Sequence, residues 1–347
     1  MKLKKILLAL SVCLPCVTVP LQTYATQSSA LYEVFSADDL KNPRDFSGVA
    51  YITQGGNVLF NMSNNLLNNN ENAAFNINTQ FIIGSLSKQI TATLVLRQVD
   101  KELLKLDDSI STYLPEIKQQ GYSVVTLRHL LNHTSGITKL THPLKTKPGE
   151  VFAYSNTGYN LLGKIVSVVS GQSYSSLAMQ LFQQCGMKDS VSVAKNTLPP
   201  TSLVDGFHEK EIAHLELLIS QFPYQTIPSG GVISTAHDLS KWNQCLHKSR
   251  LLSPEMHQEM VKKVKSRKHR WGDLGYGFAL QLSTDLAQTE WSHSGYVKGY
   301  ISTMSYYPDS DTSLIVLENI SWYPKNMPRV FYYHDRLREE LLSILAK

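Results

Sequence analysis

The chain has 347 residues, of which 42% are hydrophobic and 18% charged, and this composition supports a sizeable core and excludes wholesale disorder. Its net charge is +5, but Lys2, Lys4 and Lys5 supply three of those charges, which leaves 30 basic against 28 acidic residues. This balance gives no electrostatic footprint for nucleic acid, so we expect no nucleic-acid partner.

The first 25 residues have the pattern of a secretory signal peptide. A basic start precedes the apolar run of residues 6–19, and Thr23 and Ala25 place small residues where a signal peptidase cleaves. The run is shorter than the ~20 residues that span a bilayer, and no later stretch is longer and as apolar. We therefore expect cleavage near Ala25 and an exported protein, periplasmic or secreted, with one hydrolase domain over residues 26–347 and no transmembrane segment.

Strand patterns lie at both ends of the chain and a helical pattern lies between them. The strand signals are residues 46–53, 58–62, 276–282, 289–293, 300–307 and 313–319. Residues from about 85 to 260 have helical apolar spacing, and a closing helix has the stripe Val330, Leu337, Leu341, Leu342 and Leu345. We expect an α+β fold in which one antiparallel sheet, from about 44–62 and 276–319, is flanked by helices and interrupted by an all-helical subdomain.

Ser85 and Lys88 form a Ser-x-x-Lys pair at the start of the helical region. If residues 85–100 are helical, the two side chains share one face, which continues as an apolar stripe. Burial there would lower the pKa of Lys88, and a neutral amine can take the proton of a serine hydroxyl. Ser85 would also lie where free N–H groups at the helix start can stabilise an oxyanion. The spacing alone is weak, because a second pair, Ser192 and Lys195, has no helix after it.

Two further segments carry polar groups that could join this chemistry. Tyr154 and Asn156 precede a helical pattern, so the phenol could share proton transfer, while Asn156 is also a good helix cap. His293 ends a predicted strand and Gly295 comes two residues later, and a histidine at a strand edge could bind a substrate carboxylate or assist proton transfer. The plainer interpretations are a buried tyrosine, a cap and a surface histidine.

In chain order, these segments resemble a known family. The chain is similar to the serine hydrolases of the class C β-lactamase group, which also holds D-alanyl-D-alanine carboxypeptidases and several esterases. The resemblance runs from about Phe46 to the C-terminus through residues 79–88, 104–108, 126–136, 148–156, 229–235 and 291–295. Each segment alone is modest, whereas their order and spacing together are specific.

The resemblance implies a role for each matching position. Ser85 corresponds to the nucleophile, Lys88 to the lysine that activates it, and Tyr154 to a tyrosine that shares general acid and base duty. Asn156 corresponds to a residue that hydrogen-bonds the substrate amide and the lysine. The remaining matches are substrate-binding His293 and Gly295 of the third motif, and the backbone N–H groups of Ser85 and Tyr296 as oxyanion hole. No cofactor and no metal are implied.

The chain departs from the β-lactamases at the third motif, which begins with His293 where they have lysine. A histidine has a reference pKa of about 6.5 and is mostly neutral at pH 7, so it anchors the carboxylate of a penicillin weakly. This argues against an efficient β-lactamase. Residues 138–147 also form a shorter loop than in many members, which favours an open cleft for bulky or polymeric substrates.

We therefore expect an exported serine hydrolase that cleaves an amide or ester through an acyl-enzyme, with D-alanyl-D-alanine carboxypeptidase-like or esterase activity. Its partners would be a small ester, β-lactam or D-alanyl peptide, with cell-wall polymer as a further candidate. The alternatives are a class C-like β-lactamase and a non-catalytic cell-wall-binding protein. The intact Ser85, Lys88 and Tyr154 argue against the non-catalytic alternative.

Three other features have plainer interpretations. His129 and His133 have the spacing of metal ligands on a helix, but no third ligand is evident and we expect no metal site. The basic run 262–270 is more simply a solvated loop or helix face, with anionic cell-wall polymers or lipid head groups as the other reading. Cys185 and Cys245 could form a disulfide worth about 4 kcal/mol, but we expect two separate buried thiols.

Overall fold

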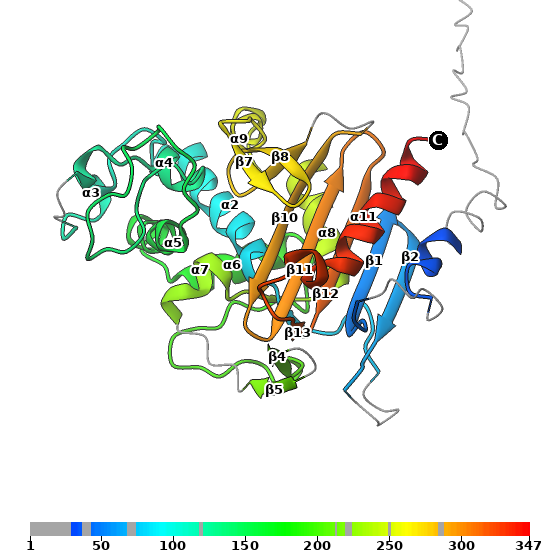
Figure 1. The fold of residues 1–347 in the computed structure, drawn as a ribbon. Coiled ribbons are helices and arrows are strands. Elements are labelled where there is room, and N and C mark those ends of the chain that lie inside the picture. Colours follow the sequence, from blue (N-terminus) through cyan, green and yellow to red (C-terminus); the bar gives the residue numbers. More distant parts are fainter. Residues whose placement is uncertain are drawn as a thin grey trace, which may run out of the picture.

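A computed structural model describes residues 29–36, 43–67, 74–117, 121–211, 214–218, 224–248, 251–283 and 288–347. The predicted signal peptide, residues 1–25, lies outside this part of the chain. Figure 1 shows a large sheet with helices on both faces and a further group of helices to one side. Within the described residues, no helix combines the length and apolar character needed to cross a bilayer.

The central sheet has eight antiparallel strands that come from both ends of the chain (Figure 1). In sheet order they are β2 (Asn57–Asn64), β1 (Gly48–Gln54), β12 (Thr312–Glu318), β11 (Tyr300–Tyr307), β10 (Glu290–Val297), β9 (Gln281–Ser283), β8 (Gly272–Tyr276) and β7 (Lys265–His269). Strand β1 pairs with β12, so that Gly48 lies opposite Glu318. The predicted α+β fold, with one sheet joining the two chain ends, is confirmed.

Side chains alternate along the strands between two hydrophobic cores. Val49 and Tyr51 of β1 face the larger core, together with helix α8 (Ala236–Lys248). Ala50 and Ile52 face the smaller core, which helix α11 (Tyr332–Leu345) covers after the short helix α10 (Met327–Val330). Successive side chains of a strand point to opposite faces of the sheet, so a strand that is buried on both faces is apolar along its whole length. This run of apolar residues explains why β1 and β12 could be predicted from the sequence.

The segment between β2 and β7 contains most of the helices. They are α2 (Ser87–Asp100), α3 (Ile110–Tyr113), α4 (Leu127–Leu131), α5 (Asn156–Ser170), α6 (Tyr174–Gln184), α7 (Ile227–Gly230), α8 and α9 (Pro254–Met260). Helix α2 contacts α5, α6 and α7 and is buried along most of its length. A short 3-10 turn, η2 (Gly84–Leu86), leads into it.

The inserted segment is not all-helical, which corrects our expectation. Strands β4 (Gly206–Glu211) and β5 (His214–Leu218) pair with each other, and β4 also pairs with β13 (Ile320–Ser321). Two shorter strands, β3 (Phe81–Ile82) and β6 (Ile233–Ser234), form a second small sheet. The β4–β5 hairpin is rich in charged side chains and half exposed, so its hydrophobic pattern was too weak to read.

The basic run is also not a loop or helix face. Residues 265–269 form β7, the edge strand of the central sheet, and they pair with β8 across a tight turn. The C-terminal part of the sheet therefore begins at residue 265 and not at 276. A lysine-rich edge strand keeps its charges in solvent while its backbone completes the sheet, and this pattern is readily mistaken for a solvated segment.

Cys185 and Cys245 are joined by a disulfide, so the expectation of two separate thiols is wrong. Cys185 ends α6 and Cys245 lies in α8, and their Cα atoms are 5.5 Å apart. Both side chains pack against the larger core. The end of α6 lies beside α8 at this bridge, and sequence spacing carries no trace of that approach.

Candidate active site

Ser85 lies in the turn η2, at the point where the chain enters α2. Buried Ile83 and Leu86 anchor this turn on either side of the serine. Gly84 has a φ of 53°, in the left-handed region that side chains seldom adopt, so a glycine is suited to this tight approach. The hydroxyl of Ser85 is thus presented at the start of a long buried helix.

Lys88 is fully buried one turn after Ser85, and its Nζ atom contacts three oxygen atoms. It donates hydrogen bonds to Asn156 Oδ1 at 2.8 Å and to the carbonyl oxygen of Ser229 at 2.6 Å, and it lies 3.0 Å from Ser85 Oγ. Burial lowers the pKa of Lys88 well below its usual value. A neutral amine has two N–H donors and one lone pair, so the two carbonyl oxygens leave the lone pair for the Ser85 hydroxyl.

Tyr154 approaches Ser85 from the other side, and its hydroxyl donates a hydrogen bond to Ser85 Oγ at 2.8 Å. The residue keeps 39% of its surface accessible, but its place in the cleft strips water from the phenol and raises its pKa to about 12. Tyr154 is therefore protonated at neutral pH. The hydrogen bond to Ser85 and the raised pKa suit Tyr154 to donate a proton to a leaving group better than to act as a permanent base.

The residues around Asn156 divide capping and binding between them. Ser155 is the cap of α5, because its side chain accepts a hydrogen bond from the Gly158 N–H at 3.0 Å. Asn156, the first residue of the helix, is left free to hold Lys88 through its side-chain oxygen. The simpler reading of Asn156 as the cap is therefore wrong by one residue.

His293 is buried in β10 and both of its ring nitrogens have partners. Nδ1 donates to the carbonyl oxygen of Ser294 at 2.8 Å, which leaves Nε2 to accept from the Tyr276 hydroxyl at 3.0 Å. Burial is the main cause that lowers the pKa of His293 to about 3, and the positive charge of Arg267 adds to it. The imidazole is neutral at pH 7 and offers no positive charge to a substrate.

Gly295 allows β10 to lie directly against the turn that holds Ser85. A Cβ atom at this position would lie 2.4 Å from Ser302 Oγ, 2.6 Å from the Ile83 carbonyl oxygen and 3.0 Å from Ser85 N. Any side chain would push the two segments apart. The contact brings the backbones of Ser85 and Tyr296 together, as an oxyanion hole built from their N–H groups requires.

His133 holds the loop that carries Tyr154, a role that the sequence did not reveal. Its Nδ1 accepts a hydrogen bond from the Ser155 N–H at 3.1 Å, and its carbonyl oxygen accepts one from Ala153 N–H at 2.7 Å. His129, by contrast, takes part in a capping box with Thr126 at the start of α4. The two histidines thus have separate structural contacts.

A cavity of about 520 Å³ opens beside Tyr154, and the basic run forms one of its walls. Its lining includes Tyr154, Arg267, Lys268, His269, Arg270, His293, Gly295, Tyr296 and Phe331. The charge of this run is evident from its residues, but its position is not, because that position depends on β7 forming the edge of the sheet. The cavity is large enough for a small acyl substrate with its leaving group.

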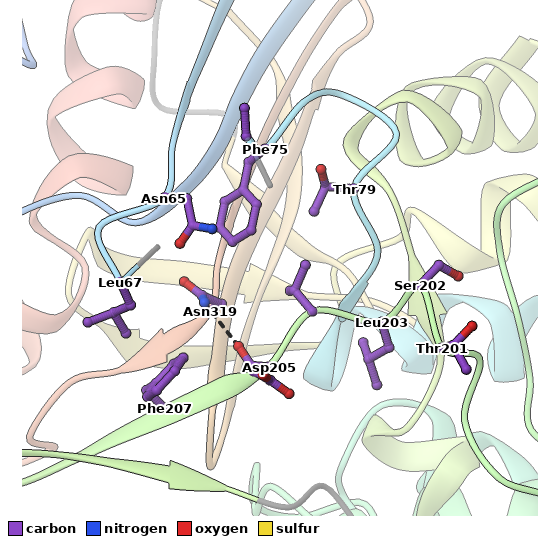
Figure 2. Close-up of a pocket in the computed structure, with 12 residues that line it drawn as sticks. Asn65, Leu67, Phe75, Thr79, Thr201, Ser202, Leu203, Asp205, Phe207 and Asn319 are labelled. Atoms are coloured by element: carbon purple, nitrogen blue, oxygen red, sulfur yellow. Dashed lines mark hydrogen bonds between the residues drawn. The ribbon is translucent and has the colours of Figure 1, made fainter. Parts of the chain in front are cut away.

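A second cavity, of about 440 Å³, lies near the start of β4 (Figure 2) and shares none of the lining residues given for the first. Asn65, Phe75 and Asp205 are among its lining residues, and Asn319 Nδ2 donates a hydrogen bond to the Asp205 carbonyl oxygen at 2.9 Å (Figure 2). Ser85, Lys88 and Tyr154 do not line it, whereas Tyr154, which contacts Ser85, lines the first cavity. The first cavity is therefore the candidate substrate site.

The chain is similar to penicillin-binding proteins in both sequence and fold. The chain is 28% identical to penicillin-binding protein 4* of Bacillus subtilis over 320 residues, which cover 81% of this chain and 70% of that protein. A penicillin-binding protein structure from Bacillus halodurans is 26% identical, has a TM-score of 0.73, and covers 90% of this chain and 99% of that one.

A D-amino acid amidase from Ochrobactrum anthropi SV3 shares the fold at 21% identity. Its TM-score is 0.78, over 92% of this chain and 99% of that one. The model of the family described as Beta-lactamase matches residues 37–335, which include each residue of the cleft described above. The β-lactamase/transpeptidase-like fold and the length of that match together show that the chain belongs to the Beta-lactamase family of serine hydrolases.

Proposed function

We propose that the protein hydrolyses an amide or ester through an acyl-enzyme on Ser85. One observation carries this proposal: Ser85 Oγ lies between Lys88 Nζ, at 3.0 Å, and the hydroxyl of Tyr154, at 2.8 Å. A serine hydroxyl needs a base to become a nucleophile and a donor to release its leaving group, and this pair supplies both.

In the proposed reaction, neutral Lys88 takes the proton of Ser85 as Oγ attacks the substrate carbonyl carbon. The N–H groups of Ser85 and Tyr296 stabilise the oxyanion of the tetrahedral intermediate. As that intermediate collapses, Tyr154 gives its proton to the leaving group and regains one from Lys88. Water then attacks the acyl-enzyme, gives its proton to the same pair of residues, and releases Ser85 and the acid.

The proposed substrates are D-alanyl peptides, in a D-alanyl-D-alanine carboxypeptidase-like reaction, or small esters. Similarity to penicillin-binding proteins supports an acyl transfer of this kind. A class C-like β-lactamase is less favoured, because His293 is neutral where those enzymes have a lysine. Rapid turnover of a chromogenic cephalosporin would reverse this order.

We also propose that residues 1–25 direct export and that the protein acts in the periplasm or outside the cell. The basic start and apolar run of the leader support this. Fractionation of cells that express the full chain, compared with a chain lacking residues 2–25, tests it. Equal retention of both forms in the cytoplasm would refute export and leave the chemistry untouched.

The chemistry is tested by mass spectrometry of the intact protein after exposure to a fluorophosphonate, penicillins, esters and D-alanyl-D-alanine peptides. We expect one adduct on Ser85, and none in Ser85→Ala. The matched control is Ser192→Ala, which alters the other Ser-x-x-Lys pair and should label normally. Full hydrolysis by Ser85→Ala would refute the assignment, and a folded wild-type protein that forms no adduct would favour the non-catalytic alternative.

A further inference from the structure

A third cavity, of about 490 Å³, lies beside helix α5. Ser85, Lys88 and Tyr154 do not line it, and it shares none of the lining residues given for the other two cavities. The apolar part of its wall includes Leu140, Leu161, Tyr174, Tyr224 and Pro228. A cavity of this size with an apolar wall and a few polar groups is suited to a small molecule.

A buried polar group in this wall has no partner within the described part of the chain. The side-chain oxygen of Asn160, Oδ1, is buried and accepts no hydrogen bond from any residue that the structure describes. A buried amide oxygen without a donor destabilises the folded protein. A ligand that supplies an O–H or N–H group to this oxygen would therefore gain affinity.

The charge of the wall favours a neutral ligand. Among the described residues that line the third cavity, Lys164 is the one charged residue, and it forms an ion pair with Glu116. The apolar side chains of the wall would strip water from an ionic ligand and offer it no partner. We therefore expect a molecule with an apolar ring or chain and one hydroxyl or amide N–H group.

The third cavity adjoins both groups that orient the catalytic lysine. Lys88 Nζ donates hydrogen bonds to Asn156 Oδ1 and to the carbonyl oxygen of Ser229. Thr157, which follows Asn156 in α5, lines the cavity. Pro228, which precedes Ser229 in α7, lines it as well. A molecule that contacts these two lining residues acts directly beside the two oxygen atoms that direct the lone pair of the amine.

Hydrogen bonds also connect the wall of the third cavity to the helix that carries Lys88. The hydroxyl of Tyr174 donates to Thr91 Oγ1 at 2.7 Å, and Thr91 donates to the carbonyl oxygen of Pro228 at 2.7 Å. Thr91 belongs to α2, as Lys88 does. A ligand that moves Tyr174 or Pro228 would therefore change how α7 lies against α2.

We propose that the third cavity is an effector site, in which a small neutral molecule donates a hydrogen bond to Asn160 Oδ1 and lowers the reactivity of Ser85. Lys88 Nζ already lies at 2.6 and 2.8 Å from its two acceptors, so a displacement of α7 would lengthen a productive contact and misdirect the lone pair. The effect on Ser85 rests on the proposed function, because it takes Lys88 as the base. Binding to the cavity does not.

Phenol and toluene test the binding, because they have nearly the same shape and differ in one O–H donor. The measured quantity is the ratio of the Kd of toluene to the Kd of phenol, from isothermal titration calorimetry. Asn160→Leu should lower this ratio about fivefold or more, because the O–H group loses its acceptor. Toluene should still bind, which also shows that the variant folds. The matched control is Gln225→Leu, which removes another amide from the lining and should leave the ratio unchanged.

The effect on Ser85 is measured as the rate of its labelling by a fluorophosphonate. Phenol at a concentration that saturates the wild type should lower the labelling rate constant about fivefold, at every fluorophosphonate concentration. The same phenol concentration should have a smaller effect on Asn160→Leu, which binds phenol more weakly.

Three results would overturn the effector site. An equal Kd ratio in the wild type and Asn160→Leu would show that the amide oxygen does not receive the hydroxyl of the ligand. Full labelling restored by excess fluorophosphonate would place the phenol in the substrate cleft, and an unchanged rate at saturation would show that the third cavity is not coupled to Lys88. A wild type that is not labelled even without phenol would instead count against the proposed function, while the Kd ratio would still test the binding.

Discussion

The Nζ atom of Lys88 lies 2.6 Å from the carbonyl oxygen of Ser229, so a helix far along the chain orients the base of the active site. Together with Asn156, this carbonyl oxygen fixes where the two N–H bonds of a neutral amine point. The lone pair is thereby directed at Ser85 before any substrate arrives. This geometry preorganises Lys88 as a base, and burial supports the same role because it lowers the pKa of the amine well below its usual value.

The protonation of Lys88 should control the pH dependence of the reaction. Below its pKa the amine is an ammonium and cannot accept a proton, so kcat/KM should rise with pH. Because burial lowers this pKa, the rise should be complete well below pH 10.5. Lys88→Arg should reduce kcat by about 10²- to 10⁴-fold, since a guanidinium is a poor base. A rate that climbs only near pH 10.5, or an active Lys88→Arg variant, would contradict this role.

Gly295→Ala should disable the site without unfolding the protein. The new methyl group would overlap Ser302 Oγ and the Ile83 carbonyl oxygen, and relief of that overlap must move the turn that holds Ser85. A displacement of this kind costs about a hundredfold in kcat. The matched control is Gly230→Ala, where a Cβ atom would meet nothing closer than 3.8 Å. Circular dichroism and acylation rates of both variants check the prediction, which fails if the two behave alike.

His133→Ala should lower kcat about tenfold or more while changing KM less, because the imidazole positions Tyr154 and does not touch substrate. The rings of His133 and Tyr154 lie 4.2 Å apart, and the loop between them is held by two hydrogen bonds. His133→Asn should recover part of the loss, since its side-chain oxygen can accept from the Ser155 N–H. Equal kinetics for the wild type and the alanine variant would refute a positioning role.

Loss of the disulfide should lower the free energy of unfolding by up to about 4 kcal/mol, because the bridge closes a long loop in the unfolded chain. The measurement is urea unfolding of the wild type, with and without reductant, and of the double variant Cys185→Ala, Cys245→Ala. Reductant should destabilise the wild type and leave the double variant unaffected. A wild type that is insensitive to full reduction would show that the bridge adds no stability.

Acid should destabilise the fold from about pH 6.5 downward, before the carboxylates titrate. Burial lowers the pKa of eight of the 11 histidines: His129, His133, His237, His247, His257, His269, His293 and His334. The unfolded state therefore binds more protons below its histidine pKa of about 6.5, and stability falls as pH falls through this range.

Each fully buried histidine, such as His133, should contribute about 1 kcal/mol to the difference in unfolding free energy between pH 7 and pH 5.5. Urea titrations at these two values measure the sum, and His133→Asn should show a smaller difference by about that amount. Equal stability of the wild type at both pH values would contradict the prediction.

Much of the fold was readable because its signals are local. The alternation of β1 and β12 and the one-turn spacing of Ser85 and Lys88 depend on neighbours in the chain, so they predicted the sheet and one side of the cleft. Tyr154 and Asn156 could be assigned roles only through resemblance to a family. The local sequence admits a buried tyrosine equally well.

The features that were missed are set by contacts between distant segments. The cysteine pairing depends on the end of α6 lying beside α8, and the role of His133 depends on a loop some 20 residues later in the chain. Arg267 belongs to a run of charges that is typical of a solvated surface, and only the pairing of β7 with β8 turns it toward the cleft. Charge in a sequence indicates composition, whereas the direction of a side chain depends on tertiary structure.

The pairing of β1 with β12 also has a consequence for how the protein comes into being. Ser85 is made early in synthesis and Tyr296 late, and the strands that fix their relative position come from opposite ends of the chain. Contacts so distant in sequence form slowly, and they cannot form on a partly synthesised polypeptide. The nascent chain is therefore expected to be inert toward acyl compounds until β10, β11 and β12 have been synthesised, and Ser85 becomes reactive only after these strands have paired.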